Sequence, residues 1–194
     1  MVLGDSIPKY VQIKNVKVHG LKGHTVNGVI DRIRFKQLQV EEFDKILVHL
    51  GSNDLSNLIT SGAINNTTVK QVLGRYKNLR ACIRRRNKRC IILWSSILPR
   101  VAEFEVFLPY TLGLNFALEK WCAQSEGCNI FIPTYSVYLV EGKPNVDLFA
   151  QDGLHLNGAG VEKLEQCFQM AFSTQYLLDR VQSKRTLKLA KLSY

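Results

Sequence analysis

Two short polar segments, one near each end of the chain, carry side chains that together could cleave an ester. Gly4-Asp5-Ser6-Ile7 offers a serine hydroxyl, and Asp152-Gly153-Leu154-His155 places a carboxylate three residues before an imidazole. A serine nucleophile needs a neutral imidazole to take its proton and a carboxylate to hold the ring. We therefore predict Ser6, His155 and Asp152 as a catalytic triad. Read singly, the same residues also suit a loop serine, a helix N-terminus and a helix cap.

Two further segments offer hydrogen-bond donors for a developing oxyanion. Asn53 lies in Gly51-Ser52-Asn53-Asp54, directly after the apolar residues 46–50, and Gly23 lies in Gly20-Leu21-Lys22-Gly23-His24. Acyl transfer requires two or three convergent donors. We predict the Asn53 amide and the backbone N–H groups of Gly23 and Ser6 as this set, while turn glycines and an Asx-turn asparagine are the structural alternatives.

Short apolar runs alternate with longer helical patterns, which is typical of βα units around a parallel sheet. The expected strands span residues 1–4, 16–19, 45–50, 90–95 and 129–132, and the expected helices span 25–35, 68–86, 109–125 and 158–181. Thr67 and Thr68 can cap the second helix, and Pro109 suits a first helical turn. Ser6 and Asn53 then follow strands at the carboxyl edge of the sheet, where open α/β sheets bind ligands.

The four segments, in this order, resemble the SGNH or GDSL-type hydrolase family over nearly the whole chain. The family pattern falls on Ser6, Gly23, Asn53 and the Asp152/His155 pair. The resemblance implies a flavodoxin-like three-layer α/β/α sandwich with a five-stranded parallel sheet, Ser-His-Asp chemistry and no cofactor. The sequence departs from the family pattern at Lys22 and His24. This departure changes the local charge and makes His24 an alternative to His155 as the base.

Within that family the chain looks most similar to the esterase domains of first open-reading-frame proteins in chicken-repeat-type LINE retrotransposons. This resemblance implies flanking domains in a longer protein and a cytoplasmic ribonucleoprotein, or a site at membranes. The short first strand also suggests a domain cut from a longer protein.

Composition limits the class of protein. The 194 residues, 46% hydrophobic and 22% charged, predict one globular domain over residues 1–182 with a basic tail over 183–194. No apolar run approaches the roughly 18 residues of a spanning helix, and the start is unlike a signal peptide. Five cysteines and four histidines lack metal-ligand spacing, so we expect no metal, reduced thiols and a cytoplasmic protein that is not secreted.

The net charge of +10 is unevenly placed. No acid lies between Asp54 and Glu103, a stretch that holds the densest basic run of the chain, Arg84, Arg85, Arg86, Lys88 and Arg89. Such a run predicts a docking patch for a polyanion, either RNA or an anionic membrane. A solvated helix face explains the same charges without a partner.

The sequence thus predicts a serine esterase acting on short-chain, acetyl-like esters, including those of lipids. Residues 97–108 are expected to form the pocket wall, with Leu98, Pro99, Phe104 and Phe107 either lining it or belonging to the core. The alternatives are a catalytically silent SGNH-like module that binds RNA or membrane through its basic face, and an esterase for O-acetylated sugars.

Overall fold

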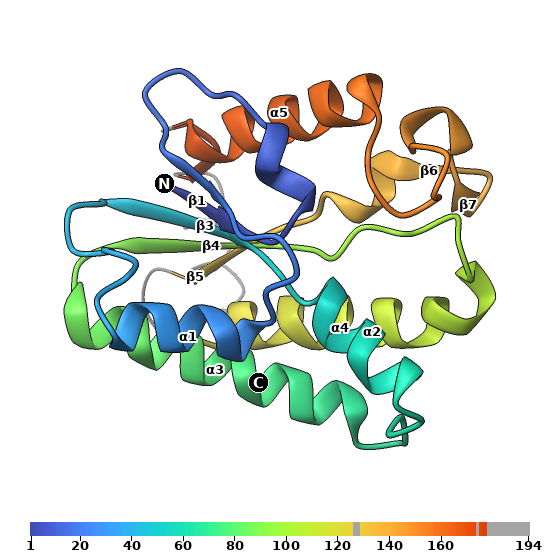
Figure 1. Cartoon of the computed structure of the whole chain (residues 1–194). Coiled ribbons are helices and arrows are strands. Elements are labelled where there is room, and N and C mark those ends of the chain that lie inside the picture. Colours follow the sequence, from blue (N-terminus) through green and yellow to red (C-terminus); the bar gives the residue numbers. More distant parts are fainter. Residues whose placement is uncertain (126–128, 174, 178–194) are drawn as a thin grey trace, which may run out of the picture.

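A five-stranded parallel sheet runs through the middle of the protein (Figure 1). The computed structural model describes residues 1–125, 129–173 and 175–177. The strand order is β2-β1-β3-β4-β5, and every neighbouring pair is parallel. The strands are β1 (Val2–Gly4), β2 (Val18–Gly20), β3 (Lys45–His49), β4 (Ile91–Ser95) and β5 (Asn129–Ile132). All five lie where the apolar runs of the sequence predict them.

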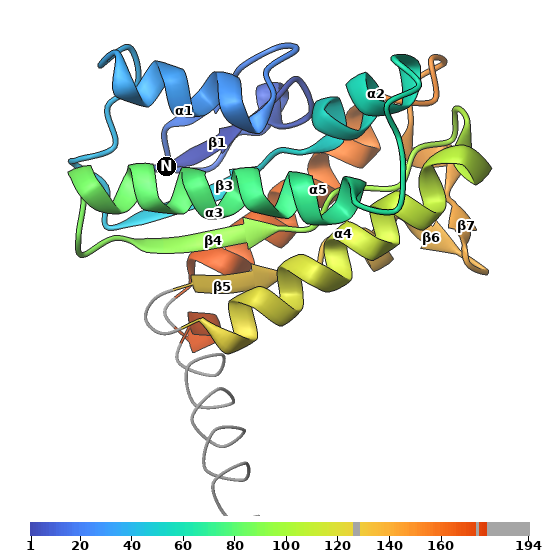
Figure 2. The same ribbon diagram turned by 90° about the horizontal axis from the view of Figure 1, so that it is seen from below.

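Helices cover both faces of this sheet, which makes the predicted three-layer α/β/α sandwich (Figures 1 and 2). One face packs against α1 (Val26–Arg34), α3 (Thr68–Arg86) and α4 (Phe104–Gln124). The other packs against α5 (Gly158–Phe172) and the 3₁₀ helix η1 (Ile7–Tyr10). The remaining elements are α2 (Ser52–Thr60), η2 (Tyr135–Tyr138), β6 (Leu139–Val140), β7 (Lys143–Pro144) and η3 (Val146–Leu148).

The continuous apolar character of the strands follows from burial on both faces. In β3, Ile46 and Val48 join the core beneath α1 and α3, whereas Leu47 joins the core beneath α5. All three side chains are fully buried. A strand of alternating polar residues would leave one of the two helical layers without a partner.

Two predicted helix starts are wrong in detail. Helix α4 begins at Phe104, so Pro109 lies inside it rather than in its first turn. Burial of Phe107 stabilises the first turn of α4. This stabilisation outweighs the loss of the one backbone hydrogen bond that Pro109 cannot donate. At α3, neither Thr67 nor Thr68 caps the helix: the Thr67 side chain makes no capping bond, and the Thr68 hydroxyl accepts from the Asn65 N–H instead.

Other differences concern missing or shortened elements. Helix α2 was not expected, because Gly51-Ser52-Asn53-Asp54 reads as a loop, whereas the chain turns into a helix from Ser52 onward. Helix α5 ends at Phe172 and residues 175–177 are again helical, whereas the end expected near Val181 lies outside the described residues. The basic tail over residues 183–194 lies outside the described residues, so the domain boundary at 182 stays a prediction. No helix in the described ranges is long and apolar enough to span a membrane.

The topology sets where a ligand can be bound. The chain leaves β1 to one side to form β2 and then crosses to the other side to form β3. Such a switch opens a crevice at the carboxyl ends of the two central strands. Ser6 follows β1 and Asn53 follows β3, so both residues lie at this point.

Candidate active site

The predicted triad residues meet at the carboxyl edge of the sheet. Ser6 Oγ lies 3.0 Å from His155 Nε2, although the two residues are 149 positions apart in sequence. On the other side of the ring, His155 Nδ1 lies 2.7 Å from Asp152 Oδ2. With Nδ1 donating to the carboxylate, Nε2 is left as the acceptor that faces the serine hydroxyl. The arrangement can therefore move a proton from serine to imidazole.

A tight loop between η3 and α5 orients the imidazole. Asp152 Oδ1 accepts the backbone N–H groups of Leu154 and His155, each at 2.9 Å, while Oδ2 holds the ring. Gly153 makes the turn with a φ of +64°. The hydrogen bond from the His155 side chain and then these two N–H groups lower the pKa of Asp152 to about 2. Asp152 is therefore ionised at neutral pH and holds the ring as a carboxylate.

Ser6 follows a point where the end of β1 lies very close to β3 and to η1. A Cβ on Gly4 would lie 2.7 Å from the carbonyl oxygen of His49, so a glycine is needed there. The next residue, Asp5, is 2% exposed and accepts the Ile7 N–H at 3.0 Å. This bond starts η1 and turns Ser6 toward the crevice.

Among the described residues, each of the three predicted oxyanion donors keeps an N–H hydrogen available for an oxyanion. Among the described residues, the backbone N–H groups of Ser6 and Gly23 donate to no other group. Gly23 adopts a φ of +73° on an exposed turn. The Asn53 side-chain amide donates one of its two hydrogens to the carbonyl of His24, at 3.1 Å, and the second is left for an oxyanion. That bond also ties the Gly23 turn to the start of α2.

A buried ion pair behind Asn53 was not found from sequence. Asp54 has no exposed surface, accepts the Val26 N–H at 2.9 Å and pairs with Arg75 at 2.7 Å. Burial raises the pKa of Asp54, and the bonds from Arg75 and Val26 oppose that rise. The pair joins α1, α2 and α3 beneath the oxyanion donors. An acid beside a motif asparagine was visible in the sequence, but its partner 21 residues away was not.

The structure gives the other histidines different surroundings. His24 Nε2 accepts from Arg32 Nε at 2.8 Å, and its Nδ1 lies 3.1 Å from the carbonyl of Lys22. Both ring nitrogens are thus engaged away from Ser6, which argues against His24 as a rival base. His49 is 2% exposed and packs in the core, where burial lowers its pKa to about 4. His19 is half-buried in β2.

The expected pocket wall divides into buried and accessible parts. Leu98 and Phe107 are 5% and 4% exposed and belong to the two cores. Phe104 is half-buried. Within the described ranges, no three His, Cys, Asp or Glu side chains are grouped so that they could hold a metal ion.

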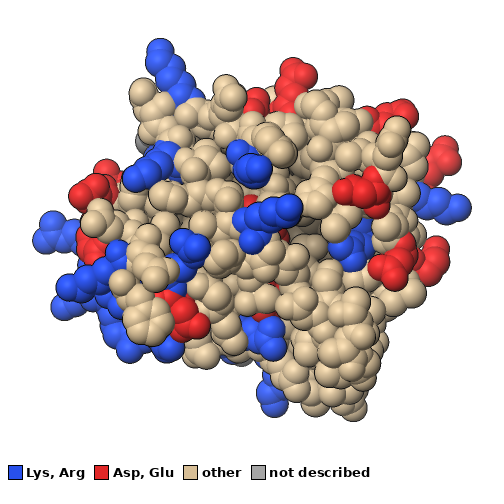
Figure 3. All heavy atoms as spheres, viewed as in Figure 1, with Lys and Arg blue, Asp and Glu red and all other residues tan. Residues whose placement is uncertain are grey.

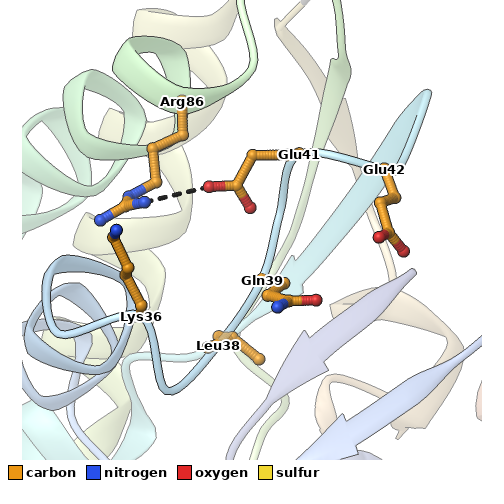
Figure 4. A pocket seen from close by; sticks show the side chains of 6 residues that line it. All are labelled: Lys36, Leu38, Gln39, Glu41, Glu42 and Arg86. Atoms are coloured by element: carbon orange, nitrogen blue, oxygen red, sulfur yellow. Dashed lines mark hydrogen bonds and ion pairs between the residues drawn. The ribbon is translucent and has the colours of Figure 1, made fainter.

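The predicted docking residues lie at the opposite edge of the sheet. Basic side chains gather over the carboxyl ends of α1 and α3 (Figure 3). We call Arg84, Arg85, Arg86, Lys88 and Arg89 the basic cluster. Arg86 points at Glu41, 3.0 Å away, across a surface pocket of about 310 Å³ that Lys36, Leu38, Gln39 and Glu42 also line (Figure 4). Arg85, Lys88 and Arg89 remain exposed.

Comparisons with known proteins agree with the observed fold. The model of the GDSL-like lipase/acylhydrolase family matches residues 2–163. A structure described as a putative platelet activating factor from Streptococcus pneumoniae is 20% identical, covers 91% of this chain and 82% of that chain, and has a TM-score of 0.71. A carbohydrate esterase of family 3 from Talaromyces cellulolyticus is 18% identical, with 92% and 97% covered and a TM-score of 0.63.

The expected retrotransposon relationship is not settled by these comparisons. The esterase domain of the ZfL2-1 ORF1 protein from a zebrafish retrotransposon is 23% identical, with 88% and 95% covered, but its TM-score is 0.48. The relationship to retrotransposon proteins therefore stays a prediction. No curated protein matches the sequence. The family match spans most of the chain and contains every segment of the candidate site, and the chain therefore belongs to the GDSL-like lipase/acylhydrolase family of hydrolases.

Proposed function

We propose that this protein is a serine esterase that hydrolyses carboxylic esters through Ser6, His155 and Asp152. The observation that carries the proposal is the unbroken chain of contacts, 3.0 Å from Ser6 Oγ to His155 Nε2 and 2.7 Å from His155 Nδ1 to Asp152. Distances of this size are within reach for proton transfer. Membership of an acylhydrolase family supports the same reaction.

Each residue of the site has its own role in the proposed hydrolysis. Ser6 Oγ attacks the acyl carbonyl while His155 Nε2 takes the hydroxyl proton, and Asp152 stabilises the imidazolium that results. The N–H groups of Ser6 and Gly23 and the second hydrogen of the Asn53 amide hold the oxyanion. His155 then gives its proton to the leaving alcohol. It next accepts a proton from the water that attacks the acyl-enzyme, and returns this proton to Ser6 as the acid is released.

The substrate of this proposal is a short-chain, acetyl-like ester, including esters of lipids. The connection after β4 supports a small acyl site, because Leu98 and Phe107 turn into the cores instead of opening a long apolar channel. The proposal also places the protein in the cytoplasm, and the four described cysteines, which are buried and form no disulfide with one another, support a reducing compartment.

The first test is hydrolysis of 4-nitrophenyl acetate by the protein and by Ser6→Ala, with Ser61→Ala as the control. Ser61 is an exposed serine at the end of α2, far from the triad in sequence. Loss of the nucleophile should lower kcat at least about 10³-fold, since residual catalysis then rests on binding and the oxyanion donors alone. Ser61→Ala should keep the full rate. Equal rates for folded wild type and Ser6→Ala would contradict the proposal.

A second candidate function, docking on single-stranded nucleic acid, is favoured by one feature of the basic cluster. Phe35 is 73% exposed and follows Arg34, whose carbonyl accepts from Arg86 at 3.1 Å. Cations beside an exposed aromatic ring are the elements that bind phosphates and stack bases. This function coexists with the esterase because the two sites occupy opposite edges of the sheet. A retrotransposon protein, as the sequence suggests, would use both.

A further inference from the structure

Arg100 is a buried cation that has no hydrogen-bond partner among the described residues. The residue is 9% exposed, and its guanidinium lies over the ring of Phe107, 3.8 Å from the ring centroid. It makes no hydrogen bond and no ion pair with any residue of the described ranges. A guanidinium carries five donors, and a buried charge is normally paired because its desolvation costs several kcal/mol. The stacking on Phe107 offsets only part of this cost.

The two nearest carboxylates do not serve as its partner. Asp152 and Glu103 both favour the charged form of Arg100, yet neither reaches it. The oxygens of Asp152 are already occupied by the Leu154 and His155 N–H groups and by the imidazole. Glu103 is exposed, in a left-handed conformation with a φ of +52°. The donors of Arg100 are therefore available to a ligand.

Hydrogen bonds fix the backbone on both sides of Arg100, to α4 on one side and to the triad loop on the other. On one side, Asn115 bonds both the N–H and the carbonyl of Ile97, at 2.8 and 2.9 Å. On the other, the N–H groups of Val101 and Ala102 donate to the carbonyl of Gly153, at 2.8 and 3.1 Å. Gly153 lies inside the loop that holds Asp152 and His155. Arg100 is thus held beside the triad loop without the freedom of a surface side chain.

We propose that Arg100 binds an anionic group, a carboxylate or phosphate, carried by the ester that Ser6 attacks. The inference rests on the proposed esterase function and names the class of its substrate. A planar, preorganised guanidinium binds such groups through paired N–H···O bonds. The anion supplies the missing partner of Arg100, and the ester is oriented toward Ser6 by this second contact. Arg100 acts in substrate specificity and takes no part in the proton transfers.

The test uses matched pairs of charged and neutral esters. On the acyl side, 4-nitrophenyl hydrogen adipate is compared with 4-nitrophenyl methyl adipate. On the alcohol side, 3-acetoxybenzoate is compared with methyl 3-acetoxybenzoate. The readout is the ratio of kcat/KM for the anionic ester to that for its neutral partner, in wild type, Arg100→Met, Arg100→Lys and Arg34→Met. The pair that shows a preference identifies the side of the ester that carries the anion.

We expect the ratio in at least one pair to fall about tenfold or more in Arg100→Met, mainly through KM, because a charge-assisted hydrogen bond is lost. Arg100→Lys should retain part of the ratio. Arg34→Met removes the same charge from an exposed arginine at the other edge of the sheet and should retain all of it. A purely structural role for Arg100 would lower both esters of a pair equally. An unchanged ratio in both pairs would overturn the proposal.

Wild-type protein gives a measurement that needs neither activity nor a folded variant. Titration with adipate, 3-hydroxybenzoate and inorganic phosphate should shift the Arg100 Nε–Hε resonance in NMR spectra, and added salt should weaken the effect. If all four esters are hydrolysed equally by wild type and Ser6→Ala, the esterase proposal fails while this titration still reports on Arg100. If no anion shifts the resonance, the anion site is absent even in an active esterase.

Discussion

At the candidate site, Asp5 helps to position Ser6 but lowers the stability of the folded protein at neutral pH. Its carboxyl is 2% exposed and starts η1 by accepting the Ile7 N–H. Burial raises the pKa of Asp5 to about 6, against an ordinary value of 3.8, although the Ile7 N–H and the nearby His155 oppose the rise. At neutral pH the protein therefore keeps a buried negative charge directly before Ser6.

This raised pKa predicts a pH dependence of folding. An acid whose pKa is higher in the folded state contributes stability that is complete below about pH 4 and is lost as pH rises to about 6. Asp5→Asn keeps an oxygen for the Ile7 N–H without the charge. Relative to wild type, its free energy of unfolding should thus rise by about 2 kcal/mol between pH 4 and pH 7. Urea denaturation at several pH values measures this difference.

The control for this experiment is Asp44→Asn, which removes an exposed carboxylate. Its stability curve should run parallel to that of wild type over the same pH range. If the Asp5→Asn curve is also parallel to wild type, then Asp5 is not the source of the pH dependence.

At the scale of elements, the turn from β3 into α2 determines where Asn53 lies. Gly51 has a φ of +109°, and a Cβ there would lie 2.5 Å from Tyr76 Oη and 2.8 Å from Ile97 Cδ1. The Tyr76 hydroxyl in turn donates to the carbonyl of Leu50. Because Gly51 has no side chain, Tyr76 of α3 and Ile97 of the segment after β4 can pack against the turn between β3 and α2.

Gly51→Ala should destabilise the protein by about 3 kcal/mol, because backbone strain and a clash with Tyr76 act together. Gly62→Ala is the matched control. Gly62 also has a positive φ, +66°, but nothing lies within 4 Å of a Cβ placed there, so it should cost only about 1 kcal/mol. Thermal and urea unfolding of both variants would measure the two costs. Equal losses would show that the packing around Gly51 adjusts without cost.

The elements also show how far sequence reasoning can reach. The five strands and α1 and α3 were predictable because each carries a strong local signal, either a continuous apolar run or an apolar stripe at helical spacing. The start that the sequence predicts for α4 is five residues late, because the burial of Phe107 decides where the helix begins and burial is a tertiary property. The catalytic segments could be predicted because their types and order form a recognisable pattern. Arg100 and the Asp54–Arg75 pair could not, because their roles depend on contacts that no spacing encodes.

For the whole molecule, the important feature is the separation of two chemistries. The triad and oxyanion donors occupy the carboxyl edge of the sheet. The basic cluster lies beyond the amino edge, on the side where Lys and Arg side chains gather in Figure 3. The cluster is not uniformly positive, since Glu41 neutralises Arg86. The exposed cations that remain available for a polyanion are Arg85, Lys88 and Arg89.

Binding to a labelled single-stranded RNA, followed by fluorescence anisotropy, should weaken steeply as salt rises from 50 to 200 mM. Counterion release gives a slope of roughly 0.7 per phosphate contact, so replacing Arg85, Lys88 and Arg89 with Gln should lower the slope by about 2. Replacing Lys9, Lys14 and Lys17 with Gln removes the same net charge from another surface and should leave the slope unchanged. Absence of binding at 50 mM salt would exclude this function, whereas binding only to anionic vesicles would point to a membrane.

The distance along the chain between Ser6 and His155 has a consequence for biosynthesis. The nucleophile is translated 149 residues before its base. A nascent chain therefore carries an inert serine until the loop before α5 has been made, and any product of premature termination before His155 stays inert. Catalysis by this protein would report that the chain has been translated through His155 and that the two halves of the triad have folded together.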